Sequence, residues 1–321
     1  MKKIIWIVVI VLIVLAVVAL NKETINSGPI KIGVLAPLSG PVADYGEEIR
    51  NGVLAGKGDS QVEFIFEDEQ CDAKAAVSAF QKLTTFDKVS LIIGPGCGSP
   101  QEALAPLLKD KRVVMLVPSA ASRTLYDASG GQFFNIQYSL EDESKFVAEE
   151  MLKRGFKKVA LVTYGNAFSA THAKSFKENY KGELASEVVL LDDNANLLPE
   201  LTKIKNLKVD AIYAPDISFF FGTGMAKMEQ LGLTKPIFTT YVAELPAARP
   251  LVGGVYYSFP ENIAGDKGAV FALSKEATEI LITSAEKCEG DSACVRDDLL
   301  TSGNFNEFGV SKRGFTMKQI P

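Results

Sequence analysis

Histidine is almost absent from this sequence: one residue, His172, occurs among 321. A single imidazole excludes a multi-histidine metal centre and leaves little scope for a histidine general base. Positive charge is also scarce, since 34 Lys and Arg stand against 39 Asp and Glu, for a net charge of −5. A nucleic-acid groove needs clustered Lys and Arg to displace counterions. We therefore expect no metal, no cofactor and no nucleic-acid partner, and we expect His172, which lies among Ser, Thr and Lys, to be a surface residue.

A long apolar run occurs only at the N-terminus. Residues 4–20 are 17 consecutive apolar residues that follow Lys2 and Lys3. The run is slightly long for the core of a signal peptide, ~7–15 residues, and slightly short for a membrane span of ~20. Residues 1–20 are therefore either a cleaved signal peptide or a retained membrane anchor, followed by a polar linker at 21–28. Both alternatives place the remaining chain outside the cytoplasm, in the periplasm or on the outer face of the cytoplasmic membrane.

The sequence has only four cysteines, which allow three disulfide pairings. Cys288 and Cys294 are close enough in sequence to close a small loop. That pairing leaves Cys71 and Cys97, each beside the end of a predicted strand. Four buried free thiols are the alternative, but an oxidising compartment favours disulfides. A zinc site is disfavoured because the sequence contains no C-x-x-C pair.

Short β-rich runs alternate with helical segments along most of the chain. This order predicts parallel sheets with right-handed crossovers, divided between two doubly wound α/β lobes. The predicted strands are 30–36, 62–67, 89–93, 113–117, 158–163, 187–191, 210–214, 236–240 and 255–259. The predicted helices are 44–54, 72–84, 100–110, 140–154, 168–180, 218–231, 268–287 and 291–300.

The most informative segment is the glycine-rich turn at residues 94–99, GPGCGS, which follows a predicted strand and precedes a predicted helix. Ser99 and Glu102 have the spacing of an S-x-x-E capping box, and Pro100 suits the first helical position. Small residues at a helix start leave backbone N–H groups accessible to an anion. The turn is therefore either a carboxylate- or phosphate-binding site or an ordinary capped turn. A second turn, VPSAAS at 117–122, offers the same alternatives.

Motifs of enzymes are missing. No G-x-S-x-G sequence surrounds Ser99, nothing places His172 beside it, and the glycine pattern at 94–98 does not fit a dinucleotide fingerprint. We therefore expect a binding protein and not an enzyme. Tyr45, Phe168 and Tyr241 lie near predicted strand ends or helix starts, where a ligand in a crevice between α/β lobes would contact them.

Several segments together resemble periplasmic solute-binding proteins of the branched-chain amino-acid (Leu/Ile/Val) type, the receptors of ABC importers. Residues 39–46 match the S-G-P-x-x-x-Y-G motif of that family, and residues 67–83 match its D-x-x-C-D-P-x-x-A helix start, with Ala73 in place of Pro. The two turns at 92–99 and 117–122 match as well, and residues 305–320 are similar to its closing strands. Cys71 and Cys97 have the separation of the disulfide in this family.

The resemblance implies a type I periplasmic-binding fold, in which three crossing strands form a hinge between two lobes. The first lobe would comprise residues 29–138 and 259–301, and the second 139–258 and 302–321. A small ligand, an amino acid or an organic acid, would bind between the lobes, and the closed form would contact an ABC permease. A membrane-tethered ectodomain of the same fold that senses a ligand for signalling is the alternative function.

The resemblance also implies a set of ligand-binding residues. The ligand carboxylate would lie on two turns of the first lobe, Cys97–Ser99 and Ser119–Ala121. Gly98 and Ala121 stand where the family has Ser and Thr, so two side-chain hydroxyls are lost. The aromatic walls would be Tyr45 and Phe168. The backbone carbonyl for the ligand amine would be that of Ser119, and Ala120 lies in the same turn. The amine-binding Glu of the family falls near Val242, so either Asp216 or Glu244 compensates for it, or the ligand is not a branched-chain amino acid.

Overall fold

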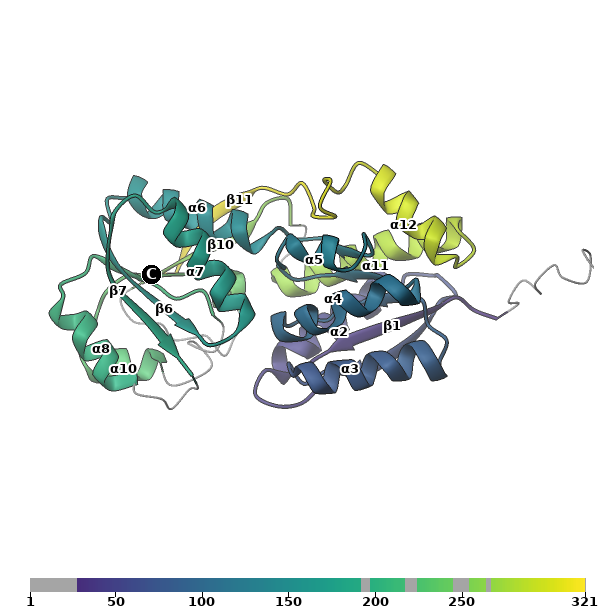
Figure 1. Cartoon of the computed structure of the whole chain (residues 1–321), viewed down its shortest axis with the longest axis horizontal. Helices are drawn as coiled ribbons and strands as arrows, with labels where there is room; N and C mark the ends of the chain where they lie inside the picture. Colours follow the sequence, from purple (N-terminus) through teal and green to yellow (C-terminus); the bar gives the residue numbers. More distant parts are fainter. Residues whose placement is uncertain (1–27, 192–196, 217–223, 245–253, 264–266, 321) are drawn as a thin grey trace, which may run out of the picture.

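The computed structural model describes residues 28–191, 197–216, 224–244, 254–263 and 267–320, and these form two α/β lobes side by side (Figure 1). Each lobe is built on one sheet. The first sheet has five parallel strands in the order β2-β1-β3-β4-β5, and the second has six in the order β11-β10-β9-β8-β6-β7. The predicted two-lobe α/β architecture is therefore confirmed.

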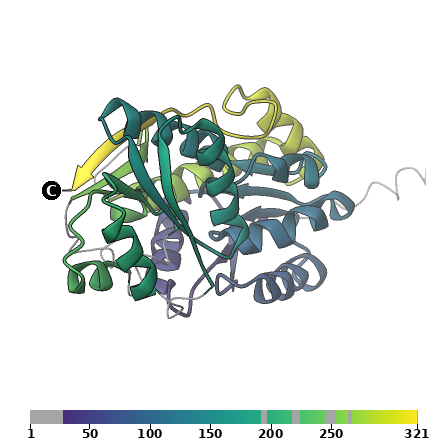
Figure 2. The ribbon, with the colours of Figure 1, turned by 60° about the vertical axis from the view of Figure 1, so that its left-hand side comes forward.

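The strands of the first sheet are β1 (Lys31–Ala36), β2 (Glu63–Asp68), β3 (Leu91–Ile93), β4 (Val114–Val117) and β5 (Phe133–Asn135). Those of the second sheet are β6 (Lys158–Tyr164), β7 (Glu183–Leu190), β8 (Ala211–Tyr213), β9 (Ile237–Thr239), β10 (Val255–Pro260) and β11 (Phe315–Ile320). Only β11 runs antiparallel to its neighbour, and Figure 2 shows it as the yellow strand at the edge of the sheet. It comes from the part of the chain where the sequence resembles the closing strands of the family.

Helices cover both faces of the first sheet, which explains its continuous apolar strands. Ile93 of β3 packs in the core shared with α2 (Ala43–Gly56), α11 (Ala269–Lys287) and α12 (Ser292–Thr301). Its neighbour Ile92 packs on the opposite face, with α3 (Ala73–Gln81), the π-helical turn η1 (Lys82–Phe86), α4 (Gly98–Lys111) and α5 (Thr124–Ala128). Both isoleucines are fully buried.

The second sheet is covered in the same way. One face packs against α6 (Leu140–Lys153) and α7 (Ala167–Asn179), and the other against α8 (Leu197–Asn206) and α10 (Gly224–Gln230). A 3-10 turn, η2 (Tyr241–Glu244), follows β9. The helix predicted at 218–231 is described only in its α10 part, and the rest lies outside the described residues.

Two glycines let α2 and α11 approach each other closely, although more than 200 residues of chain separate them. A β-carbon at Gly52 would lie 2.4 Å from the carbonyl oxygen of Phe271, and one at Gly56 would lie 2.6 Å from that of Lys275. No side chain fits in either place. The late helix α11 is therefore an integral part of the first lobe.

The chain passes between the two sheets three times: after β5, after β10 and before β11. The first passage is rigidified by Asn135, whose side chain donates to the carbonyl of Tyr138 over 2.7 Å and accepts from the N–H of Gln137 over 2.7 Å. These passages bring the carboxyl ends of both sheets to the region between the lobes.

Strand β5 and the helices α5 and α8 were not predicted. A three-residue strand, a five-residue helix and a helix with a proline near its start all give weak periodic signals. The prediction that His172 is a surface residue is wrong: it is fully buried, with Nδ1 2.6 Å from Ser144 Oγ, because α7 packs this side against α6. The apolar run 4–20 lies outside the described residues, and within them no helix is long and apolar enough to cross a membrane.

Candidate ligand-binding site

A cavity of about 360 Å³ lies between the lobes, where the carboxyl ends of strands and the starts of helices meet. The first lobe lines it with Pro41, Val42, Tyr45, Gln70, Cys71, Gly96, Cys97, Gly98, Ser99, Ser119 and Ala120. The second lobe and the hinge side line it with Glu143, Asn166, Phe168, Asp216, Thr240 and Tyr241. Eight of the ten residues that we predicted to bind ligand are in this lining; Ala121 and Glu244 are not.

The start of α4 forms one wall of the cavity. The N-cap residue is Cys97, the helix begins at Gly98, and no side chain caps it. The predicted capping by Ser99 and Glu102 is therefore wrong, because the helix starts one residue before Ser99. The first-turn N–H groups of a helix have no partner inside the helix, so those of Gly98 and Ser99 remain available to an anion.

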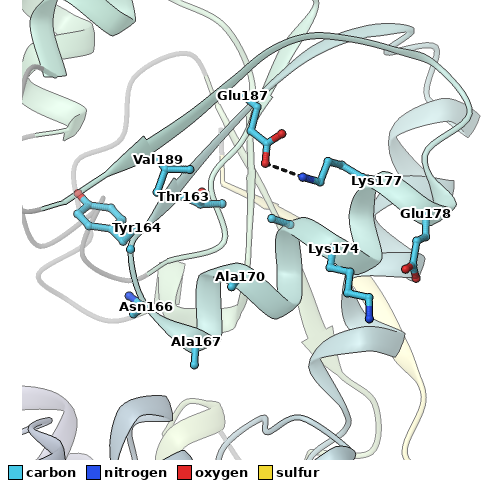
Figure 3. Close-up of a pocket in the computed structure, with 12 residues that line it drawn as sticks. Thr163, Tyr164, Asn166, Ala167, Ala170, Lys174, Lys177, Glu178, Glu187 and Val189 are labelled. Carbon is cyan, nitrogen blue, oxygen red and sulfur yellow. Dashed lines mark hydrogen bonds and ion pairs between the residues drawn. The ribbon is translucent and has the colours of Figure 1, made fainter.

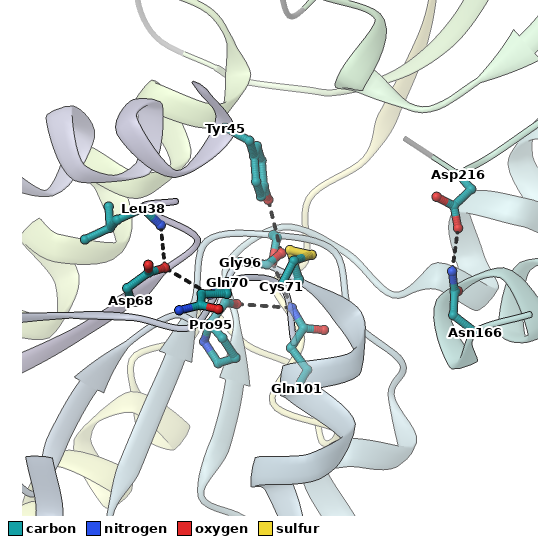
Figure 4. Close-up of a disulfide and its surroundings, with 12 residues drawn as sticks. Leu38, Tyr45, Asp68, Gln70, Cys71, Pro95, Gly96, Gln101, Asn166 and Asp216 are labelled. Atoms are coloured by element: carbon teal, nitrogen blue, oxygen red, sulfur yellow. Dashed lines mark hydrogen bonds between the residues drawn. A yellow bond between two sulfur atoms is a disulfide. The ribbon is translucent and has the colours of Figure 1, made fainter. Parts of the chain in front are cut away.

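A disulfide between Cys71 and Cys97 fastens this wall, with the two Cα atoms 5.3 Å apart (Figure 4). It joins the turn before α3 to the turn before α4. The other disulfide, Cys288–Cys294, connects α11 to α12 and does not line the cavity. All four cysteines are thus paired as we expected.

Hydrogen bonds hold the two turns of the first lobe together. Gln101 donates from Nε2 to Ser119 Oγ over 2.8 Å and to the carbonyl of Pro95 over 3.3 Å. Tyr45 donates to the carbonyl of Gly96 over 3.2 Å. Ala121, one residue beyond the lining, is buried, and its carbonyl accepts from the N–H of Leu140.

Residues of opposite lobes also approach each other within the cavity. The hydroxyl oxygens of Tyr45 and Tyr241 lie 3.5 Å apart. Gly98 faces Phe168 so closely that a β-carbon at position 98 would lie 2.9 Å from Cβ of Phe168. Ser in place of Gly98 would collide with Phe168, which gives a physical reason for the missing hydroxyl.

Asp216 supplies a carboxylate to the wall opposite α4 (Figure 4). It is 3% exposed, and its Oδ2 accepts from Ser169 Oγ over 2.6 Å and from Asn166 Nδ2 over 2.9 Å. No Lys, Arg or His is among the described residues that line the cavity. The described lining therefore combines the N-terminal end of α4 with the carboxylate of Asp216.

Glu244 is directed elsewhere. Its Oε1 accepts from the hydroxyl of Tyr257 over 2.9 Å and from Nζ of Lys318 over 3.1 Å. Of the two acidic residues that we expected to bind an amine, the fold brings only Asp216 to the cavity. The sequence left the choice open because both residues follow strands of the same sheet.

Sequence reasoning missed two buried carboxyl groups. Glu69 is fully buried behind the Cys71–Cys97 disulfide, and burial raises its pKa to about 8 against the opposing effect of the N–H groups of Cys71, Gly96 and Cys97. Glu143 is also fully buried, and burial raises its pKa to about 7. Both residues belong to acidic stretches that are typical of a solvated surface, so no local pattern marks either of them as buried.

A second hollow of about 710 Å³ lies on the second lobe, between α7 and the strands β6 and β7 (Figure 3). Ala167 and Ala170 form its floor, and Lys177 Nζ lies 2.8 Å from Glu187 Oε1 on its rim. None of the residues that we predicted to bind ligand lines it. The interlobe cavity is therefore the candidate site.

Comparison with known proteins identifies related chains. A sequence profile described as "periplasmic binding protein" matches residues 29–272. The Leu/Ile/Val-binding protein BraC3 of Rhizobium johnstonii is 28% identical over 200 residues, which cover 57% of this chain and 53% of that protein. The Leu/Ile/Val-binding protein homolog 6 of Brucella abortus is 26% identical over 296 residues, 86% of this chain and 76% of the relative. The match thus spans about half the length of the first relative.

Solved structures agree in fold. A leucine-binding protein from Thermotoga maritima superposes with a TM-score of 0.81 at 18% identity and covers 90% of this chain and 94% of that one. A solute-binding protein of an ABC transporter from R. palustris, in complex with benzoate, gives 0.78 at 18% identity, with 90% and 92% covered. At such identities the likeness concerns the fold alone.

Proposed function

Because this chain belongs to the periplasmic binding protein family, we propose that it is an extracytoplasmic receptor that binds an amino acid between its lobes for uptake by an ABC importer. One observation carries the choice of ligand: the start of α4 and the carboxylate of Asp216 line the same cavity, which has no basic side chain among its described residues. The ligand carboxylate would accept from the N–H groups of Gly98 and Ser99. The ligand ammonium would bind Asp216.

Aromatic carboxylates are a second candidate class. The cavity has three aromatic residues, Tyr45, Phe168 and Tyr241, and one structurally similar protein holds benzoate. Such a ligand would use the α4 turn in the same way. It would make no use of the carboxylate of Asp216, to which the ammonium of an amino acid would bind. We therefore place amino acids first.

The two lobes would move relative to each other when a ligand binds. The first lobe would comprise residues 29–138 and 259–301, and the second residues 139–258 and 302–321. The three passages between the sheets would form the hinge. Residues 1–20 would export the protein or retain it at the outer face of the membrane. A solute-binding protein of this family performs no chemistry on its ligand, so the predicted ABC permease would receive the ligand unchanged.

Thermal unfolding with and without ligand tests this function. The purified protein is heated with each of the twenty amino acids and with benzoate and its hydroxylated derivatives. A ligand at 100 times its Kd adds ~2.7 kcal/mol to stability, which raises the Tm measurably. A shift with an amino acid supports the first class, and a shift with benzoates alone supports the second. A flat response to both sets would contradict the proposal. Gly98→Asp, which adds negative charge to the α4 turn, should abolish any shift.

A further inference from the structure

The side chain of Glu143 has one oxygen fully bonded and one oxygen without a partner. Its Oε1 accepts from the hydroxyl of Tyr138 over 2.9 Å and from the hydroxyl of Ser258. Its Oε2 has no hydrogen-bond partner among the described residues, although the side chain is fully buried. Glu143 lines the interlobe cavity. An acceptor buried without a donor is costly, so its presence at a cavity wall calls for a donor from the ligand.

Thr240 is a second buried residue of the same cavity whose side-chain oxygen lacks a partner among the described residues. It follows β9, it is 1% exposed, and it belongs to the lining. Its Oγ1 has no partner within the described part of the chain. A threonine hydroxyl both donates and accepts, so it can bind a carbonyl or an N–H group. Neither residue belongs to the α4 turn or to the surroundings of Asp216, which the proposed function already uses.

No cation pairs with Glu143 among the residues that the structure describes. His172 is the nearest basic group, with Nε2 3.7 Å from Oε2, which is too long for a hydrogen bond. Burial lowers the pKa of His172 to about 3, so the imidazole is neutral at physiological pH. The other titratable groups that face Glu143 are the hydroxyls of Tyr138, Tyr213 and Tyr241. No donor of the described residues lies within hydrogen-bond distance of Oε2, so a donor on a ligand in the cavity would complete its bonding.

We propose that Glu143 and Thr240 form a second polar subsite that binds the side chain of the ligand, and that the ligand is an amino acid whose side chain ends in a nitrogen donor. This inference rests on the proposed function and narrows its ligand class. An amide side chain would donate N–H to Glu143 Oε2 and accept from Thr240 Oγ1. An amine side chain would bind Glu143. A leucine or isoleucine side chain would leave both oxygens unpaired.

Calorimetric titration with matched ligands at pH 8, where Glu143 is ionised and accepts hydrogen bonds, tests the subsite. Asparagine and leucine have nearly the same shape, as do glutamine and methionine, and lysine supplies an amine. We expect the protein to bind asparagine, glutamine or lysine at least ~10-fold more tightly than leucine and methionine, because the apolar side chains would leave buried polar groups unpaired. Preference for leucine or methionine would overturn the inference and leave the proposed function intact. Binding of no amino acid would overturn both.

Two variants test whether Glu143 and Thr240 cause the preference for ligands with a nitrogen donor. Glu143→Gln keeps an acceptor for Tyr138 and Ser258 but replaces Oε2 by a donor, so the preference for a nitrogen donor should fall ~10-fold or more. Thr240→Val removes Oγ1 at constant shape and should weaken amide ligands more than lysine. Glu244→Gln makes the same exchange outside the cavity and should change no ligand preference. Unchanged selectivity in both Glu143→Gln and Thr240→Val would refute the subsite; if Glu143→Gln fails to fold, Thr240→Val decides alone.

Discussion

Gly98 of the first lobe and Phe168 of the second lie in direct contact across the ligand cavity. A β-carbon added to Gly98 would be 2.9 Å from Cβ of Phe168, closer than real Cβ contacts come. Cβ of Phe168 is fixed to the backbone of α7 and cannot rotate away, so only a movement of the lobes would relieve the overlap. The closeness of the lobes at this point therefore requires a glycine.

Substitution at Gly98 tests this relationship. Gly98→Ala should weaken ligand binding ~10-fold or more, because overpacking costs about 1–3 kcal/mol. Adding Phe168→Gly, which removes the opposing Cβ, should restore part of the affinity, whereas adding Phe168→Ala should not. Calorimetry on the single and double variants measures both effects. Equal affinities of Gly98→Ala and the unaltered protein would show that the ligand-bound lobes lie further apart.

Asp216 should determine recognition of an amino group. Asp216→Asn keeps the volume of the side chain but removes the charge, and it should weaken amino-acid binding by ~2–5 kcal/mol. The same substitution should change the affinity for a carboxylic acid without an amino group only slightly. Glu244→Gln, outside the cavity, is the matched control. If both variants bind the amino acid as the unaltered protein does, the ligand ammonium lies elsewhere.

Glu69 should make stability depend on pH. Its pKa is about 8 in the folded protein against 4.5 for the free side chain. Between these values the folded state holds a proton that the unfolded state has released, so stability falls as pH rises from 4.5 to 8, by at most ~1.4 kcal/mol per pH unit. Glu69→Gln should therefore be more stable than the unaltered protein at pH 8, with the advantage lost near pH 4.

Urea unfolding across this pH range measures the effect. The exposed residue Glu307 provides the control, since Glu307→Gln should leave the pH dependence unchanged. Glu143, whose pKa is about 7, adds a contribution of the same sign between pH 4.5 and 7. Parallel stability curves for Glu69→Gln and the unaltered protein would mean that Glu69 stays ionised in the fold.

The two disulfides should differ in their effect on binding. The bridge Cys71–Cys97 joins residues 26 apart in sequence, and Cys288–Cys294 joins residues 6 apart. Replacing both cysteines of a bridge by serine should cost ~3.5 kcal/mol of stability for the first and ~2.4 kcal/mol for the second in the chain-entropy model. Only the cysteines of the first bridge line the cavity, so only the loss of that bridge should also lower the affinity for the ligand. Unfolding and titration of both variants measure this; a loss of affinity in the second variant would contradict the assignment.

Much of the architecture could be predicted because apolar runs alternate regularly with helical segments. The strands that are buried on both faces, such as β1 and β4, are continuous apolar stretches. Turn residues such as Gly and Pro separate these stretches from the helices. The turn before α4 was recognisable for the same reason, since its glycines and Pro100 mark a close turn into a helix.

The interior polar groups could not be predicted. His172 and Glu143 both lie on helices whose local sequence is polar, and their burial arises only when α6 and α7 pack together in the folded lobe. The choice between Asp216 and Glu244 depended on which direction each side chain takes at the end of its strand. Glu244 forms an ion pair with Lys318 on β11, 74 residues later in the chain, and no local pattern encodes that contact.

The close packing of α11 on α2 has a consequence for how the chain folds. The first lobe begins with β1 but receives α11 only after all of the parallel strands of the second lobe have been made. Its core therefore cannot close early during synthesis, and folding must wait for contacts of high sequence separation, which form slowly. Because α11 is made late, we expect a nascent chain with this order of segments to be nearly full length before the lobe that carries the α4 turn is complete.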